Sequence, residues 1–115
     1  MNRKELKDAY KQQKFKMGVF QIRNAVNQKI LVESSINLDA IWNRYRFALN
    51  MGGHPNTDLQ KEWKEFGEDN FAFEVLAEVK EQEDKVVDYK QEAKTLGEMF
   101  IEELQPFGER GYHKR

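Results

Sequence analysis

The stretches that decide the fold of this chain are Gly18-Val19-Phe20 and Lys29-Ile30-Leu31-Val32-Glu33-Ser34-Ser35. Both contain the β-branched and aromatic side chains that favour strands. The segment between them, Asn24-Ala25-Val26-Asn27-Gln28, is polar and Asn-rich, as is typical of a hairpin loop. The sequence therefore predicts an antiparallel hairpin, with one strand over residues 17–23 and a second that ends at the two serines.

Two helices are predicted after the hairpin. Asn37 is a suitable N-cap, and Gly52-Gly53-His54-Pro55 supplies the non-helical positions that end the first helix. Asn56 or Thr57 is expected to cap a shorter helix, which Gly67 ends. Apolar residues recur in both segments at spacings of three and four, as expected for helices with one buried face: Leu38, Ile41, Trp42, Tyr45 and Leu49, then Leu59, Trp63 and Phe66.

The rest of the chain contains a third strand and a long charged helix. Residues 70–79 are predicted as the strand and residues 82–104 as the helix, followed by an ordered or semi-ordered loop to Arg115. The helix is expected to place one apolar stripe against the sheet: Val86, Tyr89, Ala93, Leu96, Phe100 and Leu104. An N-terminal amphipathic helix is predicted over roughly residues 3–14, with apolar residues Leu6, Tyr10 and Phe15 in and beside it.

Length and composition limit the class of protein. The 115 residues suit one domain, and a chain of that size can bury a modest core without a covalent staple. There is no cysteine, which excludes disulfides and thiolate metal sites. The polar start predicts no signal peptide, and no stretch approaches the roughly 20 apolar residues of a membrane span. We expect a soluble, cytoplasmic protein that does not associate with a membrane.

The charges are unevenly distributed along the chain. Residues 1–64 contain twelve Lys or Arg and six Asp or Glu, whereas residues 65–115 contain seven and fourteen. This asymmetry favours a basic face that meets phosphates and an acidic side turned away from them. Two solvated helical faces of opposite sign would give the same counts, so the charge alone does not decide between them.

The paired strands, taken with the later segments, resemble the GIY-YIG endonuclease family. The order hairpin, helix, helix, strand, long helix matches that family over about residues 17–113. The motifs that carry the resemblance, besides the two strands, are Ser34-Ser35, Asn37-Leu38, Trp42-Asn43-Arg44, Gly53-His54-Pro55-Asn56, Leu59-Gln60, Trp63, Gly67, Phe71-Ala72-Phe73-Glu74-Val75-Leu76, Phe100-Ile101-Glu102-Glu103-Leu104 and Gly111-Tyr112. The resemblance implies an α+β fold, a three-stranded antiparallel sheet flanked by helices. This domain would cover residues 17–115, after an N-terminal helical extension over residues 1–16.

The catalytic residues that the resemblance implies are missing. Members of the family use two tyrosines in the strand motifs, an arginine on the first helix, a metal-binding glutamate on the last helix and often a late asparagine. The corresponding positions in this chain are occupied by Phe20, Leu31, Ile41, Gly97 and His113. A phenyl or isobutyl group cannot position an attacking water, and groups that stabilise developing charge each lower the barrier by several kcal/mol. We therefore expect no intact catalytic site.

A few other polar residues near these positions are candidates for replacement groups. Glu98, one residue beyond the expected glutamate, is the weak candidate for a metal ligand, but a one-residue step turns a helical side chain by about 100°. Glu33 stands at the glycine of the second family motif and could be a ligand or a solvated strand-end residue. A relocated nuclease site would have to use Tyr45, His54, Arg44 and Glu98 with Mg²⁺ or Mn²⁺ as cofactor. If the domain is inactive, no cofactor is expected.

Binding candidates come from the basic half of the chain. Those proposed to meet nucleic acid are Arg23, Lys29, Arg44, Arg46, His54, Lys61 and Lys64. Trp42 and Trp63 could stack on bases, but tryptophans at helical spacing among Leu and Ile more often belong to the core.

The leading hypothesis is a catalytically inactive GIY-YIG-like domain that binds DNA or a protein partner. One alternative is a divergent metal-dependent DNA endonuclease with relocated catalytic residues. The other is a protein-interaction or regulatory module that uses its acidic long helix. The sequence does not predict an oligomeric state.

Overall fold

A three-stranded antiparallel sheet forms the centre of the computed structural model, which describes residues 15–82 and 86–114. The strands are β1 (Met17–Asn24), β2 (Ile30–Ser35) and β3 (Phe71–Val79), in the spatial order β2-β1-β3. β1 is therefore central, and it pairs antiparallel with both neighbours. The predicted hairpin and third strand are confirmed.

Local polar contacts define the hairpin loop. The Asn24 side chain accepts a hydrogen bond from the Val26 N–H at 2.9 Å, and Asn27 accepts one from the Lys29 N–H at 3.0 Å. Gln28 adopts a left-handed conformation with φ of 66°. Asn side chains that bond to nearby backbone are a common way to stabilise such turns.

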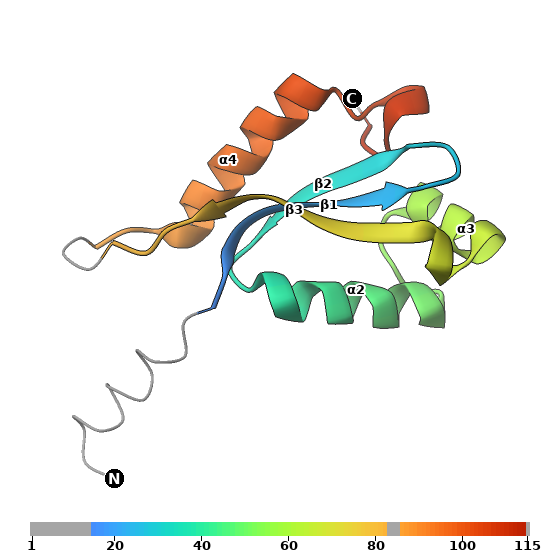
Figure 1. Cartoon of the computed structure of the whole chain (residues 1–115), viewed down its shortest axis with the longest axis horizontal. Helices are drawn as coiled ribbons and strands as arrows, with labels where there is room; N and C mark the ends of the chain where they lie inside the picture. Colours follow the sequence, from blue (N-terminus) through green and yellow to red (C-terminus); the bar gives the residue numbers. More distant parts are fainter. Residues whose placement is uncertain (1–14, 83–85, 115) are drawn as a thin grey trace, which may run out of the picture.

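Helices cover both faces of the sheet (Figure 1). On one face lie α2 (Leu38–Met51) and α3 (Thr57–Phe66), and on the other lies α4 (Tyr89–Leu104). Two short 3₁₀ turns, η1 (Glu68–Asn70) and η2 (Gly108–Arg110), complete the order of elements. The expected α+β fold, a three-stranded antiparallel sheet flanked by helices, is therefore confirmed.

The core is rich in aromatic side chains. Trp63 is 4% exposed and packs against Phe71, with ring centroids 4.9 Å apart. Trp42 is half-buried and stacks on Phe73 at 5.2 Å. Aromatic pairs in such geometries stabilise a fold beyond the area they bury. The core assignment of both tryptophans is confirmed.

The helix ends follow the predicted capping residues. Asn37 caps α2 by accepting a hydrogen bond from the Ala40 N–H at 3.2 Å, and Gly52 ends it with φ of 81°. Asn56, rather than Thr57, caps α3 through the Leu59 N–H at 3.0 Å. The Asn side chain succeeds because it reaches the third N–H of the helix from an extended backbone.

The predicted start of the last helix was wrong. α4 begins at Tyr89 and not at residue 82, because the Asp88 side chain caps it by accepting from the Gln91 N–H at 3.1 Å. Val86 precedes the helix and is fully exposed, so it does not belong to the apolar stripe. Residues 83–85 lie outside the described residues. The predicted N-terminal helix over residues 3–14 also lies outside them, and Phe15 and Lys16 are described as non-helical.

The segment after α4 is ordered against the outer edge of β2. The Tyr112 N–H donates to the Ile30 carbonyl at 3.0 Å, in a short parallel bridge between Gly111 and Ile30. The His113 N–H donates to the Pro106 carbonyl at 3.0 Å, which folds the segment back on itself. Gly111 has to be a glycine here, since a Cβ would overlap the Pro106 carbonyl.

None of the helices described is long and apolar enough to cross a membrane.

Gly18 is expected to be intolerant of any side chain. A Cβ at this position would overlap the carbonyl oxygen of Ala77 on β3, where β1 and β3 approach closely. We expect Gly18→Ala to lower the free energy of unfolding by at least about 2 kcal/mol, as other steric clashes in cores do. Urea unfolding followed by circular dichroism would measure this.

The matched control is Gly53→Ala. Gly53 has no atom within 4 Å of an added Cβ and no positive φ. Its substitution should leave stability within about 0.5 kcal/mol of the wild type. Equal stability of the two variants would contradict the close approach of β1 and β3.

Candidate functional site

The two positions at which the resemblance implies catalytic tyrosines are part of the hydrophobic core. Phe20 is completely buried and Leu31 is 2% exposed. The Phe20 ring packs against Phe73 at 5.1 Å and meets the Tyr45 ring edge-on at 5.8 Å. These side chains add apolar contacts to the α2 side of the sheet and offer no hydroxyl for proton transfer or water positioning.

The positions at which the resemblance implies an arginine and a glutamate likewise carry no charged side chain: they are Ile41 and Gly97. Ile41 packs against the core cluster from α2. Gly97 is buried where α4 crosses the sheet, and a Cβ there would lie 3.6 Å from Ser34 Cβ and 3.9 Å from Val19 Cγ2. These are ordinary van der Waals distances, so a small side chain would fit there, and the packing does not require the glycine with its low helix propensity.

The weak metal candidate, Glu98, does not join the other proposed groups. It is exposed on α4, which covers the opposite face of the sheet from α2 and its Tyr45 (Figure 1). No group of three or more His, Cys, Asp or Glu residues able to hold a metal ion occurs in the described part of the chain.

His113 takes a structural position. Its Nε2 atom accepts a hydrogen bond from the Val32 N–H at 2.9 Å, which attaches the C-terminal segment to the β2 edge. Burial lowers the pKa of this imidazole, so the neutral, accepting form is favoured.

The structure brings together three polar residues near the expected cleft. The Tyr45 hydroxyl donates to a Glu33 carboxylate oxygen, and the Tyr45 ring meets the His54 ring edge-on at a centroid distance of 4.7 Å. His54 is 6% exposed, and its Nδ1 atom accepts from the Asn56 N–H at 3.0 Å. Two of the four proposed relocated residues, Tyr45 and His54, are therefore in contact. Glu33, a separate candidate in the sequence, completes the cluster through its hydrogen bond with Tyr45.

Burial governs the ionisation of this cluster. It raises the pKa of Glu33 above its usual value, although the hydrogen bond from Tyr45 partly opposes the shift. The pKa of Tyr45 is also raised, first by burial and then by the adjacent Glu33 carboxylate. Burial lowers the pKa of His54, whose Nε2 atom is buried without a hydrogen-bond partner among the described residues.

A hollow of about 290 Å³ opens beside Glu33. Its walls come from β2, the start of α3 and the C-terminal segment, and include Leu31, Glu33, Pro55, Asn56, Tyr112 and His113. The single carboxylate of Glu33 can accept hydrogen bonds from a ligand. A divalent cation prefers several oxygen ligands, and one carboxylate supplies too few of them.

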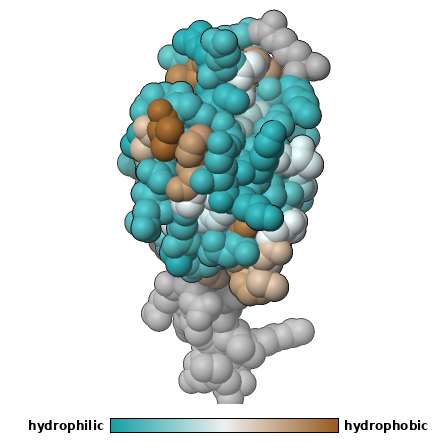
Figure 2. All heavy atoms as spheres, turned by 90° about the vertical axis from the view of Figure 1, so that its right-hand side faces the viewer, coloured by the Kyte–Doolittle hydropathy of each residue, from teal (hydrophilic) through white to brown (hydrophobic). Residues whose placement is uncertain are grey.

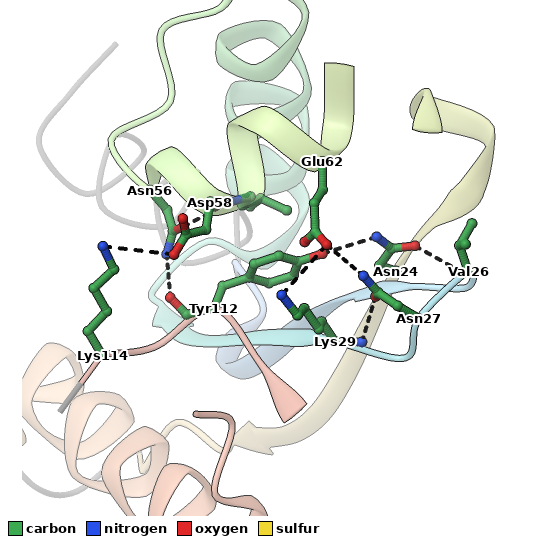
Figure 3. A network of polar contacts seen from close by, with 10 residues as sticks. Asn24, Val26, Asn27, Lys29, Asn56, Asp58, Glu62, Tyr112 and Lys114 are labelled. Carbon is green, nitrogen blue, oxygen red and sulfur yellow. Dashed lines mark hydrogen bonds and ion pairs between the residues drawn. The ribbon is translucent and has the colours of Figure 1, made fainter. Parts of the chain in front are cut away.

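Tyr112 is the centre of a polar network that sequence reasoning missed (Figure 3). Its hydroxyl accepts from the Asn24 amide at 3.2 Å, and its carbonyl accepts from the Asn56 amide at 3.0 Å. Burial raises the pKa of this phenol, and the nearby Glu62 carboxylate adds to the shift. Lys29 lies over the ring at 5.7 Å and 3.7 Å from Glu62. The Gly-Tyr pair in the tail was the signal available in the sequence, but nothing there indicated its partners.

The proposed phosphate contacts fall into two groups. Arg23, Lys29 and Arg46 are paired with Glu74 at 2.8 Å, Glu62 at 3.7 Å and Glu68 at 3.6 Å, respectively. The other three cations, Arg44, Lys61 and Lys64, are exposed and form no ion pair with a described residue. His54 is too buried to meet a phosphate in this conformation.

The opposite pKa shifts of two carboxylates give a pH test of this site. A raised pKa means that Glu33 contributes most to stability below pH 4.5, and that this contribution is lost as pH rises through its folded pKa. Glu33→Gln should therefore become increasingly more stable than the wild type between about pH 4 and pH 7. Chemical unfolding across that range would measure the difference.

Glu74→Gln is the control with the opposite sign. Hydrogen bonds from Arg23 and Gln21 lower the pKa of Glu74, so its contribution is present above pH 4.5 and lost on acidification. This variant should be less stable than the wild type near pH 7 and should approach it at acid pH. A Glu33→Gln variant that behaved like Glu74→Gln would show that Glu33 is not held in a site that disfavours its charge.

The sequence is similar to that of one curated protein over part of its length. No family model matches the chain. It is 29% identical over 73 residues to Intron-associated endonuclease 1 of Enterobacteria phage T4, a match that covers 64% of this chain and 29% of the relative. The chain thus spans less than a third of that relative's length.

Solved structures of one domain match at greater coverage. A mutant form of the catalytic domain of intron endonuclease I-TevI has a TM-score of 0.67 and 26% identity, covering 79% of this chain and 86% of the other. The catalytic domain of homing endonuclease I-TevI has a TM-score of 0.65 and 26% identity, covering 84% and 95%. The chain therefore has a GIY-YIG-like fold, that of the I-TevI catalytic domain.

Proposed function

We propose that this chain is a nucleic-acid-binding domain that uses the GIY-YIG-like fold without the hydrolytic chemistry of the family, with DNA as its partner. The observation that carries this proposal is the burial of Phe20 and Leu31 in the core, at the two positions where the family has reactive tyrosines. The relatives named above are endonucleases, which supports nucleic acid as the ligand.

The family positions lack the charged groups that the chemistry needs. Phosphodiester hydrolysis requires stabilisation of charge on the phosphate and on the leaving oxygen, and each such group is worth several kcal/mol. Ile41 offers no positive charge, and Gly97 offers no metal ligand. Because His113 is engaged with the β2 backbone, it is not free to replace them.

The cations without an ion pair to a described residue favour one side of the molecule for DNA binding. Arg44 lies on α2, and Lys61 and Lys64 lie on α3, so all three are on the helices that share one side of the sheet. The exposed carboxylates of α4 (Glu92, Glu98, Glu102 and Glu103) are on the helix that covers the other side. In total, α2 and α3 carry four Lys or Arg and four Asp or Glu, whereas α4 carries two and four, so a polyanion would meet less repulsion on the α2–α3 side.

A rebuilt nuclease is the second candidate, favoured by the contact between Glu33, Tyr45 and His54. In such a site Tyr45 donates a hydrogen bond to the Glu33 carboxylate. The proposed metal ligand, Glu98, lies on α4, on the other side of the sheet. A protein-interaction module is the third candidate, and the exposed carboxylates of α4 would be its recognition surface.

Purified full-length protein should not nick plasmid DNA. With Mg²⁺ or Mn²⁺ present, we expect conversion of supercoiled plasmid to stay at the level of a protein-free sample, because the charge-stabilising groups are missing. Nicking that EDTA stops and that Tyr45→Phe or Glu98→Gln removes would instead support the rebuilt nuclease.

Binding to DNA should be strongly salt-dependent. We expect affinity to fall linearly on a log–log plot as salt increases, because Lys and Arg release counterions from phosphates. The double variant Arg44→Glu, Lys64→Glu should bind at least about tenfold more weakly at low salt, a change of about 1.4 kcal/mol. Fluorescence anisotropy with a labelled oligonucleotide would measure both effects.

The matched control reverses two lysines on the other side of the molecule. Lys90 and Lys94 are exposed on α4, and Lys90→Glu, Lys94→Glu makes the same change in net charge. It should reduce affinity much less than the first pair. Equal losses would contradict a localised binding face.

A further inference from the structure

The outer face of α2 exposes two large apolar side chains. Phe47 is 68% exposed and Met51 is 71% exposed. They are four residues apart, and Arg44 is three residues before Phe47, so all three lie along one stripe of the helix. This stripe, Arg44–Phe47–Met51, is called the α2 outer stripe below.

Packing does not account for the outer stripe. The core takes the opposite side of α2 through Leu38, Ile41 and Leu49, and Phe47 is outside the core cluster. An exposed Phe forgoes the stabilisation that burial of its ring would give. A single exposed apolar residue is ordinary on a protein surface, but one flanked by unpaired cations has the composition of a surface that stacks bases.

The outer stripe leads into a hollow of about 370 Å³ between the end of α2 and α3. Met51, Asn50, Trp63, Lys64 and Glu68 are among its walls. Hydrogen bonds hold these walls: the Trp63 indole donates to Asn50 Oδ1 at 2.9 Å, and the Asn50 amide donates to Glu68 at 3.1 Å.

Charges of both signs lie around the hollow. Glu68 is the carboxylate in its wall, and Arg46 pairs with it at 3.6 Å, while Glu65 and Asp69 are exposed next to Lys64 and Glu68 in the sequence. Arg44 and Lys64 form no ion pair with a described residue; Arg44 is one turn before Phe47 on α2, and Lys64 lines the hollow together with Met51. Figure 2 shows that the end of the molecule with α3 and the hairpin loop is otherwise mostly hydrophilic, with only small apolar patches.

We propose that the α2 outer stripe and this hollow bind single-stranded DNA. Phe47 provides a face on which a base stacks, Met51 extends the apolar contact, and Arg44 and Lys64 neutralise the flanking phosphates. The stripe is about 10 Å long by helical rise, which spans about three nucleotides at stacked spacing.

A duplex would use only part of this surface. Its bases are already stacked on one another, so Phe47 would have no free base face to meet and only the cations would contribute. This inference rests on the proposed function, and it names the strand form that the domain prefers. A second copy of the chain could also cover an apolar stripe, but Arg44 and Lys64 would then face their own like charges, whereas phosphates complement them.

The experiment titrates the full-length protein with a single-stranded oligonucleotide that contains 2-aminopurine and with its duplex form. We expect tighter binding of the single strand and quenching of the 2-aminopurine as it stacks. Phe47→Ala should weaken single-strand binding by about 5- to 150-fold and remove the quenching, since stacking on an aromatic side chain is worth about 1–3 kcal/mol per base. Phe47→Trp should retain both.

The salt dependence separates stacking from charge. Phe47→Ala should leave the slope of log affinity against log salt unchanged, whereas Arg44→Gln should make it shallower by about 0.7, the value for one phosphate contact on a single strand. Met99→Ala, an exposed apolar change on α4, is the matched control and should alter neither quantity. Thermal unfolding would verify that each variant is folded.

Each failure has its own signature. Salt-dependent binding in which single strand and duplex are equal and Phe47→Ala matches the wild type would overturn the stacking proposal while the proposed function stands. Absence of binding to either form at low salt would overturn both. Loss of self-association on Phe47→Ala, seen by sedimentation without a change in DNA affinity, would identify a dimer interface and also overturn the stacking proposal.

Discussion

The buried side chain of Tyr112 is the contact on which the arrangement of this molecule depends. The residue comes near the end of the chain, yet its hydroxyl meets Asn24 at the hairpin and its carbonyl meets Asn56 at the start of α3. Leaving a buried polar group without these partners would cost free energy of folding, so the three segments stabilise one another cooperatively. The helix cap of α3, the hairpin loop and the C-terminal segment therefore share one set of hydrogen bonds.

The positions at which the family resemblance implies catalytic tyrosines are used for packing in this chain. Phe20 and Leu31 are buried in the core, and Gly97 is buried where α4 packs on the sheet. Active sites often hold polar groups at some expense of stability, and their replacement by apolar groups commonly stabilises a fold. The polar character that remains is concentrated in Glu33, Tyr45 and His54, where burial still opposes ionisation.

The sequence predicted those parts of the fold that depend on local chemistry. The hairpin loop, the Asn37 and Asn56 caps and the glycine helix ends each depend on a few adjacent residues, and the structure confirms them. The start of α4 was missed because residues 82–88 have helical composition, whereas the Asp88 cap defines where the helix begins. Contacts between distant segments, such as Glu33 with Tyr45 or Tyr112 with Asn24, could not be predicted, since no local pattern specifies which polar partners meet. The sequence also could not predict which cations remain free, because the carboxylates that pair with Arg23, Lys29 and Arg46 lie far from them in the sequence.

The C-terminal segment has a consequence for how the sheet can be extended. Because Gly111 bridges to Ile30 and His113 bonds to Val32, backbone groups of β2 are already engaged on its outer side. Within the described residues, β3 pairs only with β1, so its far edge is the place where another strand could add. Its nine residues are mostly apolar, and Glu74 and Glu78 supply the charges that discourage such pairing. In a concentrated solution these two carboxylates would act as gatekeepers against edge-to-edge aggregation, so they protect solubility independently of any ligand.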